Sequence, residues 1–100
     1  MTAAKRSDLL PGVPAAAEFV PGYEAYVWDA MGAPAKTPPE IVDKLNKEIN
    51  AVLSEPAIQA RFMSLGAEPM VMSPTEFGSY IASETEKWGK VVKTAHIKVD

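Results

Sequence analysis

His96 is the side chain best suited to proton transfer near neutral pH, and it is the one histidine among 100 residues. General acid–base catalysis needs a nucleophile or a carboxylate held beside the imidazole, and the sequence offers no such partner near His96. The chain has no G-x-S-x-G nucleophile turn, and its glycines are dispersed rather than gathered in a phosphate-binding loop. The sequence therefore predicts no catalytic residue. A small enzyme built on His96 is the weakest alternative, and a His96→Ala variant would then be inactive.

Metal and cofactor sites are equally unsupported by residue type. The chain has no cysteine, which excludes disulfides, thiol catalysis and thiolate ligands. A single histidine and carboxylates spread along helical faces match no ligand spacing. We therefore expect no metal site.

The aromatic residues Tyr23, Tyr26 and Trp28 are the remaining candidates for a site. Amphipathic aromatic side chains suit the wall of a pocket for a small ligand. The alternative is that they are strand residues that pack under helices, as most aromatic strand residues do. The residue types alone leave both interpretations open.

The composition indicates one domain or part of one. Of the 100 residues 47% are hydrophobic, which argues against disorder, and the formal charge is −3. An acidic chain with scattered lysines and arginines lacks the basic surface of a nucleic-acid-binding protein, and no run of basic residues suggests a membrane surface. The N-terminus lacks the apolar core of a signal peptide, and no stretch approaches the length of a membrane span, so we expect a soluble chain.

The distribution of proline and glycine divides the chain into two parts. Residues 1–24 form a connecting segment with repeated Pro-Gly turns. Residues 25–100 hold a strand and helices, as a single compact unit or a partial domain. Residues 23–33 have the aromatic and β-branched composition of a strand, and residues 67–72 read as a short edge strand that contains Pro69. Two strands are too few to be stable alone, so strand partners are missing from the prediction.

Proline-based capping patterns place the helices. Thr37, followed by Pro38 and by Glu40, predicts a capped start for a helix that reaches about residue 53. A second helix is expected from Pro56, with Gly66 as its C′ residue. Ser73 repeats the capping pattern and opens a long C-terminal helix of roughly 22 residues.

In order along the chain, several short motifs resemble the Bug family of extracytoplasmic solute receptors of tripartite tricarboxylate transporters. The similar segments are 2–7, 9–14, 20–24 with Trp28, 33–38, 45–50, 65–69, 73–77 and 86–92. Each segment is weakly specific, but the whole set in this order is specific. The sequence departs from the family pattern at Lys36, where glycine is usual, and at Asp29, where an aromatic or small residue is more common.

The resemblance implies an α/β fold, as part of a two-domain, type II-like periplasmic binding protein with a cleft between the domains. The chain is similar to the C-terminal part of such receptors: helix-rich, with one or two short strands and a long C-terminal helix. Family members are periplasmic, are not enzymes, carry no cofactor, and pass small organic dicarboxylates or tricarboxylates to membrane permease subunits.

The resemblance also implies where a ligand would lie. The family's carboxylate-binding loops lie largely upstream of the matched region, and the strand that holds Tyr26 and Trp28 returns near the cleft. These two residues are therefore the ligand-binding candidates, as cleft neighbours only. A carboxylate at Asp29 would repel an anionic ligand unless it is paired or turned away. The alternative function is a small self-associating interaction module without ligand, since unpaired strand edges favour a homo-oligomer.

Overall fold

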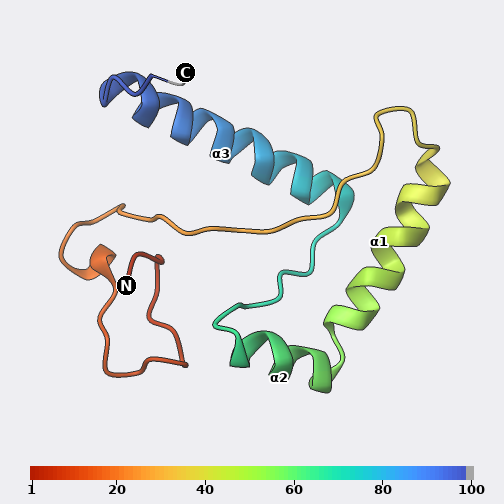
Figure 1. Cartoon of the computed structure of the whole chain (residues 1–100), viewed down its shortest axis with the longest axis horizontal. Coiled ribbons are helices and arrows are strands. Elements are labelled where there is room, and N and C mark those ends of the chain that lie inside the picture. Colours follow the sequence, from red (N-terminus) through yellow and green to blue (C-terminus); the bar gives the residue numbers. More distant parts are fainter. Residues whose placement is uncertain (99–100) are drawn as a thin grey trace.

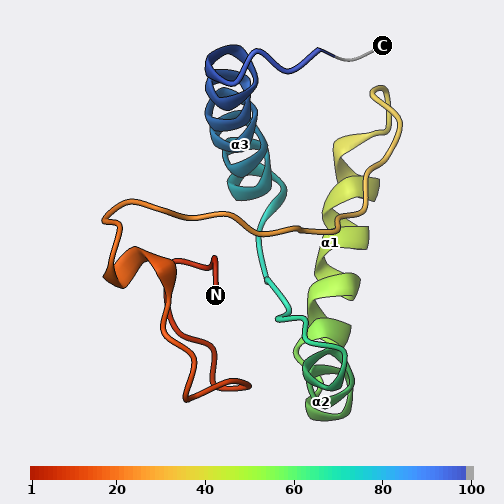
Figure 2. The same cartoon turned by 60° about the vertical axis from the view of Figure 1, so that its left-hand side comes forward.

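A computed structural model describes residues 1–98 as three α-helices joined by extended segments (Figure 1). A short 3₁₀ helix, η1, spans Ala16–Glu18 and is followed by α1 (Pro39–Leu53), α2 (Pro56–Ser64) and α3 (Pro74–Thr94). Helices α1 and α2 form a bent arm, and α3 lies apart from α2. Residues 23–33 form an extended run that leads from the N-terminal segment toward the start of α1. This extended run passes along α3, as both views show (Figures 1 and 2).

The α/β fold class expected from the sequence is wrong for this chain, because residues 1–98 contain no strand. Residues 23–33 and 67–72 are extended, as their composition predicts, but neither segment pairs with another strand within residues 1–98. Within 26–33 no backbone N–H or C=O group makes a hydrogen bond to another described residue. A β-strand is defined by the ladder to its neighbour, so strand composition without a neighbour yields only an extended chain.

The C-terminal helix begins as predicted. Glu76 N–H donates to Ser73 Oγ over 3.1 Å, and Ser73 N–H donates to Glu76 Oε2 over 2.8 Å. This reciprocal pair satisfies two backbone donors at the start of α3, where Pro74 occupies the first helical position. The helix then continues for 21 residues, which confirms the long C-terminal helix.

The predicted cap at Thr37 is wrong. Helix α1 begins at Pro39 with Pro38 as its N-cap, and no side chain caps it. The reason is the second proline: a residue that precedes proline is driven out of the helical region, and Pro38 has φ −55° and ψ 138°. The helix therefore starts one residue later than a Thr37 cap requires.

These two helix starts give a matched test of capping. Replacing Ser73 with Ala should destabilise the first turn of α3 by about 1 kcal/mol, because Glu76 N–H loses its acceptor. The Thr37→Ala variant should leave the first turn of α1 unchanged. Backbone carbon chemical shifts over residues 74–78 and 39–43 would report both effects, and equal losses at the two sites would contradict this assignment.

Gly66 is the C′ residue of α2, as predicted, with φ +76°. Gly66 N–H donates to Met63 O and Ala67 N–H donates to Phe62 O, both over 3.0 Å, as in a Schellman motif. Helix α3 ends in the same way with His96, φ +53°, in the left-handed position. The single histidine therefore has a local structural role as the residue that ends α3.

The N-terminal segment closes on itself. The Met1 ammonium donates to Pro14 O over 2.8 Å, and Arg6 donates two bonds of 2.6 Å to the Glu18 carboxylate. Ala15, inside this loop, is 1% exposed, and it is the one fully buried apolar residue of the described chain. Local contacts therefore hold residues 1–25 as a ring.

The Arg6–Glu18 pair predicts a pH dependence. The Arg6 bonds, and then the Ala15 N–H, lower the pKa of Glu18 from 4.5 to about 2. A depressed carboxyl pKa contributes stability that is complete above about pH 4.5 and is lost as the pH falls through about 2. We expect a carbon-detected NMR titration of Glu18 to show its midpoint near pH 2, and a higher midpoint in Arg6→Gln that still lies below pH 4.5 because the Ala15 N–H bond remains. Lys5→Gln serves as the control, and a normal midpoint in the unsubstituted chain would contradict the pairing.

Many large apolar side chains are exposed over the rest of the described chain, which is more open than a compact domain. The accessible surface is 8257 Å², whereas a compact monomer of this mass exposes roughly 5,500 Å². The radius of gyration is 16.5 Å, against about 13 Å for a compact 100-residue domain. The three α-helices therefore share no closed core within the described chain.

Candidate functional site

An aromatic cluster joins the extended run to α3 and contains one of the two predicted site residues. The Trp28 ring lies 5.9 Å from Phe77 and 5.5 Å from Tyr80, measured between centroids, with interplanar angles of 87° and 70°. Both are edge-to-face contacts, which are worth about 0.5–1.5 kcal/mol each beyond the area they bury. Phe77 and Tyr80 are three residues apart and so present one face of α3 to Trp28.

Tyr26, the other predicted site residue, adjoins the same cluster. The neighbouring Tyr80 hydroxyl, and after it the Glu24 carboxylate, raise the pKa of the Tyr26 phenol above its ordinary range, because both favour the protonated phenol over the phenolate. The Tyr80 hydroxyl oxygen is itself buried and makes no hydrogen bond within the described part of the chain. The two phenols are thus close neighbours in imperfect hydrogen-bond geometry. The structure brings Tyr26 and Trp28 together on α3, and their place beside a ligand stays a prediction.

Glu84 continues this face of α3 and is only 9% exposed as a residue. Its Oε2 accepts a 2.9 Å bond from Trp88 Nε1, and Lys87 Nζ lies 3.8 Å from Oε1. One hydrogen bond and one nearby cation compensate the burial of this charge. An anionic ligand would meet a negative charge here, so Glu84 marks the part of the cluster that is least suited to a carboxylate.

Sequence reasoning missed a second polar contact, between α1 and the segment before α3. Asn46 Nδ2 and Asn50 Nδ2 donate to the same acceptor, Met72 O, over 2.8 and 2.9 Å. Asn50 Nδ2 also lies 3.1 Å from Asn46 Oδ1. We call these two side chains the asparagine clamp. The spacing of four residues puts both amides on one face of α1, but nothing in the sequence says which carbonyl they bind.

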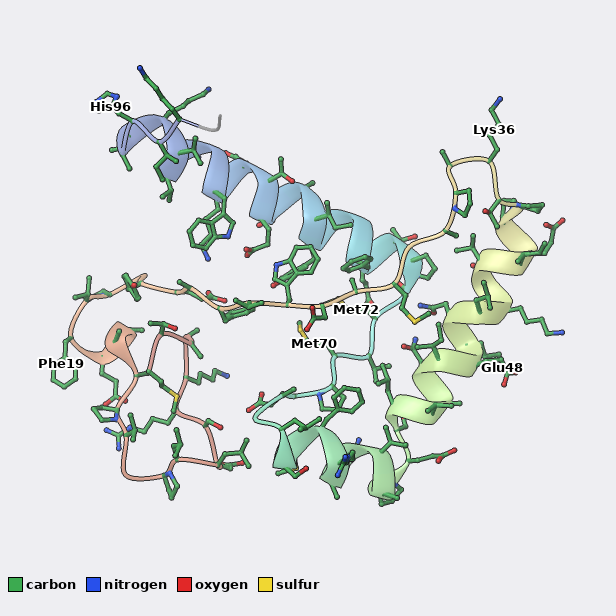
Figure 3. The ribbon with its side chains drawn as sticks, in the orientation of Figure 1. Phe19, Lys36, Glu48, Met70, Met72 and His96 are labelled. Atoms are coloured by element: carbon green, nitrogen blue, oxygen red, sulfur yellow. The ribbon has the colours of Figure 1, made fainter. Side chains whose placement is uncertain are left out.

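An open apolar hollow of about 420 Å³ lies between α1, α2 and the extended run. Its lining residues are Met31, Glu48, Ile49, Val52, Leu53, Ile58 and Phe62. Met31 is 76% exposed, so the extended run covers this side of the helical arm only in part. Phe19, Lys36 and His96 point away from the other elements and take no part in the cluster or the hollow (Figure 3).

Within residues 1–98 no group of three or more His, Cys, Asp or Glu residues could hold a metal ion. None of the helices in this range is both long and apolar enough to cross a membrane. The described part of the chain thus combines an aromatic cluster, a shared amide clamp and uncovered apolar faces.

Comparison with known proteins identifies the class of protein to which this chain belongs. A family model described as "Tripartite tricarboxylate transporter family receptor" matches residues 1–97. The chain therefore belongs to this receptor family, as the sequence motifs predicted. It is a family of transporter receptors and not a family of enzymes.

Individual relatives agree with this assignment. Protein BugT of Bordetella pertussis is 36% identical over 95 residues, which is 94% of this chain and 29% of BugT. A UPF0065 protein of Bordetella bronchiseptica is 34% identical over 98 residues, 98% of this chain and 29% of that protein. The chain thus spans less than a third of the length of these relatives.

A solved structure shows the same arrangement of elements. The structure named "R. palustris Rpa4515 with adipate" is 41% identical and has a TM-score of 0.83. The similarity covers 96% of this chain and 32% of that one. The open arrangement of helices is therefore found within a longer chain.

Proposed function

We propose that this chain forms the C-terminal part of an extracytoplasmic receptor that captures small organic dicarboxylates or tricarboxylates and delivers them to membrane permease subunits. The observation that carries the proposal is the likeness to the Rpa4515 structure, whose name includes adipate. The family match over residues 1–97 supports the same role. No catalytic step is part of this function, and the receptor acts outside the cytoplasm.

Within the receptor, Tyr26 and Trp28 lie at the wall of the cleft. Their cluster on α3 supports this placement, because it anchors the extended run that would pass the cleft. The wall itself is not a carboxylate site: Glu84 is buried on α3 one turn beyond Tyr80, and Asp29, next to Trp28 in the chain, is exposed. The groups that bind the ligand carboxylates would therefore come from outside this chain.

A hybrid receptor tests the proposal. Residues 1–97 would replace the matching third of the R. palustris protein, and adipate binding would be followed by isothermal titration calorimetry. We expect the hybrid to bind adipate, whereas the 100-residue chain alone gives no isotherm up to millimolar ligand. A folded hybrid that binds neither adipate nor other dicarboxylates and tricarboxylates would contradict the proposed function. Micromolar binding by the chain alone would contradict the external origin of the binding groups.

A further inference from the structure

Residues 29–33 are the least supported part of the extended run. Upstream of them the Ala25 N–H donates to the N-terminal segment over 2.8 Å, and the Trp28 ring contacts α3. Downstream the Pro34 carbonyl accepts a 3.0 Å bond within a turn. Between these attachments all five residues are exposed, and their backbone N–H and C=O groups make no hydrogen bond to another described residue. The backbone of this segment is therefore open to a partner.

One side chain of the segment does touch the helices. Met31 lines the apolar hollow together with residues of α1 and α2, yet it is 76% exposed. A contact that leaves most of the side chain in solvent buries little apolar area, so it holds the run weakly. It also leaves the backbone on both sides of Met31 unpaired. Segments with few buried contacts and unpaired backbone lie at the low end of local stability.

An extended, unpaired and exposed backbone is what an endopeptidase needs in its substrate. Proteins that bind an extended peptide take affinity from its main-chain groups and specificity from pockets for its side chains. Exposed segments of small residues are accordingly the preferred places for proteolytic cuts. Residues 27–33 contain no proline, so every residue of this stretch keeps its N–H. Ala30, near the middle, suits a small primary pocket such as that of elastase.

We propose that the Ala30–Met31 peptide bond is a cleavage site for an endopeptidase that binds an extended substrate and has a small, apolar primary pocket. Water is the co-reactant: its hydroxyl group joins the Ala30 carbonyl carbon, and its hydrogen joins the Met31 nitrogen as the C–N bond breaks. The products are a carboxylate at the end of residues 1–30 and an amine at the start of residues 31–100. The cut separates the N-terminal ring from the three helices, which is a modification distinct from solute capture.

The other extended segment, 67–72, fits less well. It contains Pro69, and the carbonyl at its end, Met72 O, accepts from both amides of the asparagine clamp. Bonds inside the helices fit less well again. A helical bond becomes extended only in molecules in which the helix has opened there, and cleavage follows the population of that open form. The structure thus ranks the Ala30–Met31 bond ahead of its competitors.

Limited digestion of the 100-residue chain with pancreatic elastase tests this ranking. Intact-mass spectrometry at successive times identifies the first pair of products. Synthetic peptides of residues 25–36 and 66–77 give the intrinsic cleavage rate of each extended segment, by which the rates in the protein are divided. We expect products 1–30 and 31–100 to appear first, at least about tenfold faster than those of a cut elsewhere. A first cut in 1–24, in 67–72 or within a helix would overturn the inference.

Two variants at Met31 make the test specific to one bond. Met31→Pro removes the N–H on the leaving side, but it breaks no hydrogen bond of the chain and suits a run that is already extended. Met31→Leu keeps an apolar side chain over the hollow. We expect cleavage at the bond after Ala30 to be lost in Met31→Pro and to keep its rate in Met31→Leu. Equal rates in the two variants would overturn the assignment of the bond.

The asparagine clamp provides a test of the physical cause. If free backbone selects the site, releasing a bound carbonyl should create a second one. The double variant Asn46→Ala with Asn50→Ala frees Met72 O, so cleavage of the Val71–Met72 bond should rise at least about threefold. The rate at the first site should stay the same. Without a rise at Val71–Met72, backbone pairing would not be what selects the cleavage site, and the inference would fail.

Discussion

Replacing Trp28 with Ala should detach the extended run from α3. The substitution removes both edge-to-face contacts, to Phe77 and to Tyr80, and the largest apolar side chain of the run. Truncation of a fully buried tryptophan costs about 3–5 kcal/mol, and Trp28 is half-buried, so we expect a loss of roughly 2–3 kcal/mol in the docking of the run on α3. This corresponds to a roughly 30- to 150-fold shift of that equilibrium.

The measurement follows the aromatic rings. In NMR spectra the Phe77 and Tyr80 ring protons should lose their ring-current shifts and their contacts to the run. Val27→Ala is the matched control, because the adjacent side chain is 93% exposed and its truncation should change the docking by less than about 0.5 kcal/mol. If both variants behaved alike, the aromatic cluster would not be what holds the run in place.

The helices could be predicted from the sequence because their signals are local. Ser73, Pro74 and Glu76 lie within one turn and make their contacts there, and Gly66 takes up a backbone conformation that favours glycine. The exception, Thr37, is also local in origin. Its capping pattern is complete, but Pro39 holds Pro38 out of the helix, and this effect of consecutive prolines outweighs the cap.

The strands could not be predicted in the same way, because a strand depends on a partner that no local pattern supplies. Val27 and Trp28 have strand composition and an extended backbone, yet their neighbours would have to come from elsewhere. The candidate site shares this limit. The sequence identified Tyr26 and Trp28 as a pair, but their contacts with Phe77 and Tyr80 connect residues far apart in the chain.

The asparagine clamp explains why α1 and the segment before α3 keep their relative position. Met72 adjoins Ser73, the N-cap of α3, so the carbonyl that the clamp binds lies at the start of that helix. Figure 3 shows Met70 and Met72 on the segment that leads to α3, inside the open arrangement of helices. The motif 45–50, one of those that resemble the receptor family, therefore has a physical role: it attaches α1 to the origin of α3.

Because Asn46 and Asn50 share one acceptor, their substitutions should not be additive. Removing either amide leaves Met72 O with one donor, so Asn46→Ala and Asn50→Ala should each destabilise the contact by about 0.5–1 kcal/mol. The double variant leaves a half-buried carbonyl without a donor, and we expect a loss of about 2–3 kcal/mol, more than the sum of the singles.

Hydrogen exchange of the first amides of α3 and thermal unfolding of each variant would complete the double-mutant cycle. Asn46→Asp keeps the size of the side chain but replaces a donor with a charged acceptor facing Met72 O, and it should cost at least as much as Asn46→Ala. Ser54→Ala is the matched control, since Ser54 caps the C-terminal end of α1 and its Oγ donates to Asn50 O and not to Met72 O. Additive losses at Asn46 and Asn50 would mean that the two amides act independently, and the shared carbonyl would then not be what joins α1 to α3.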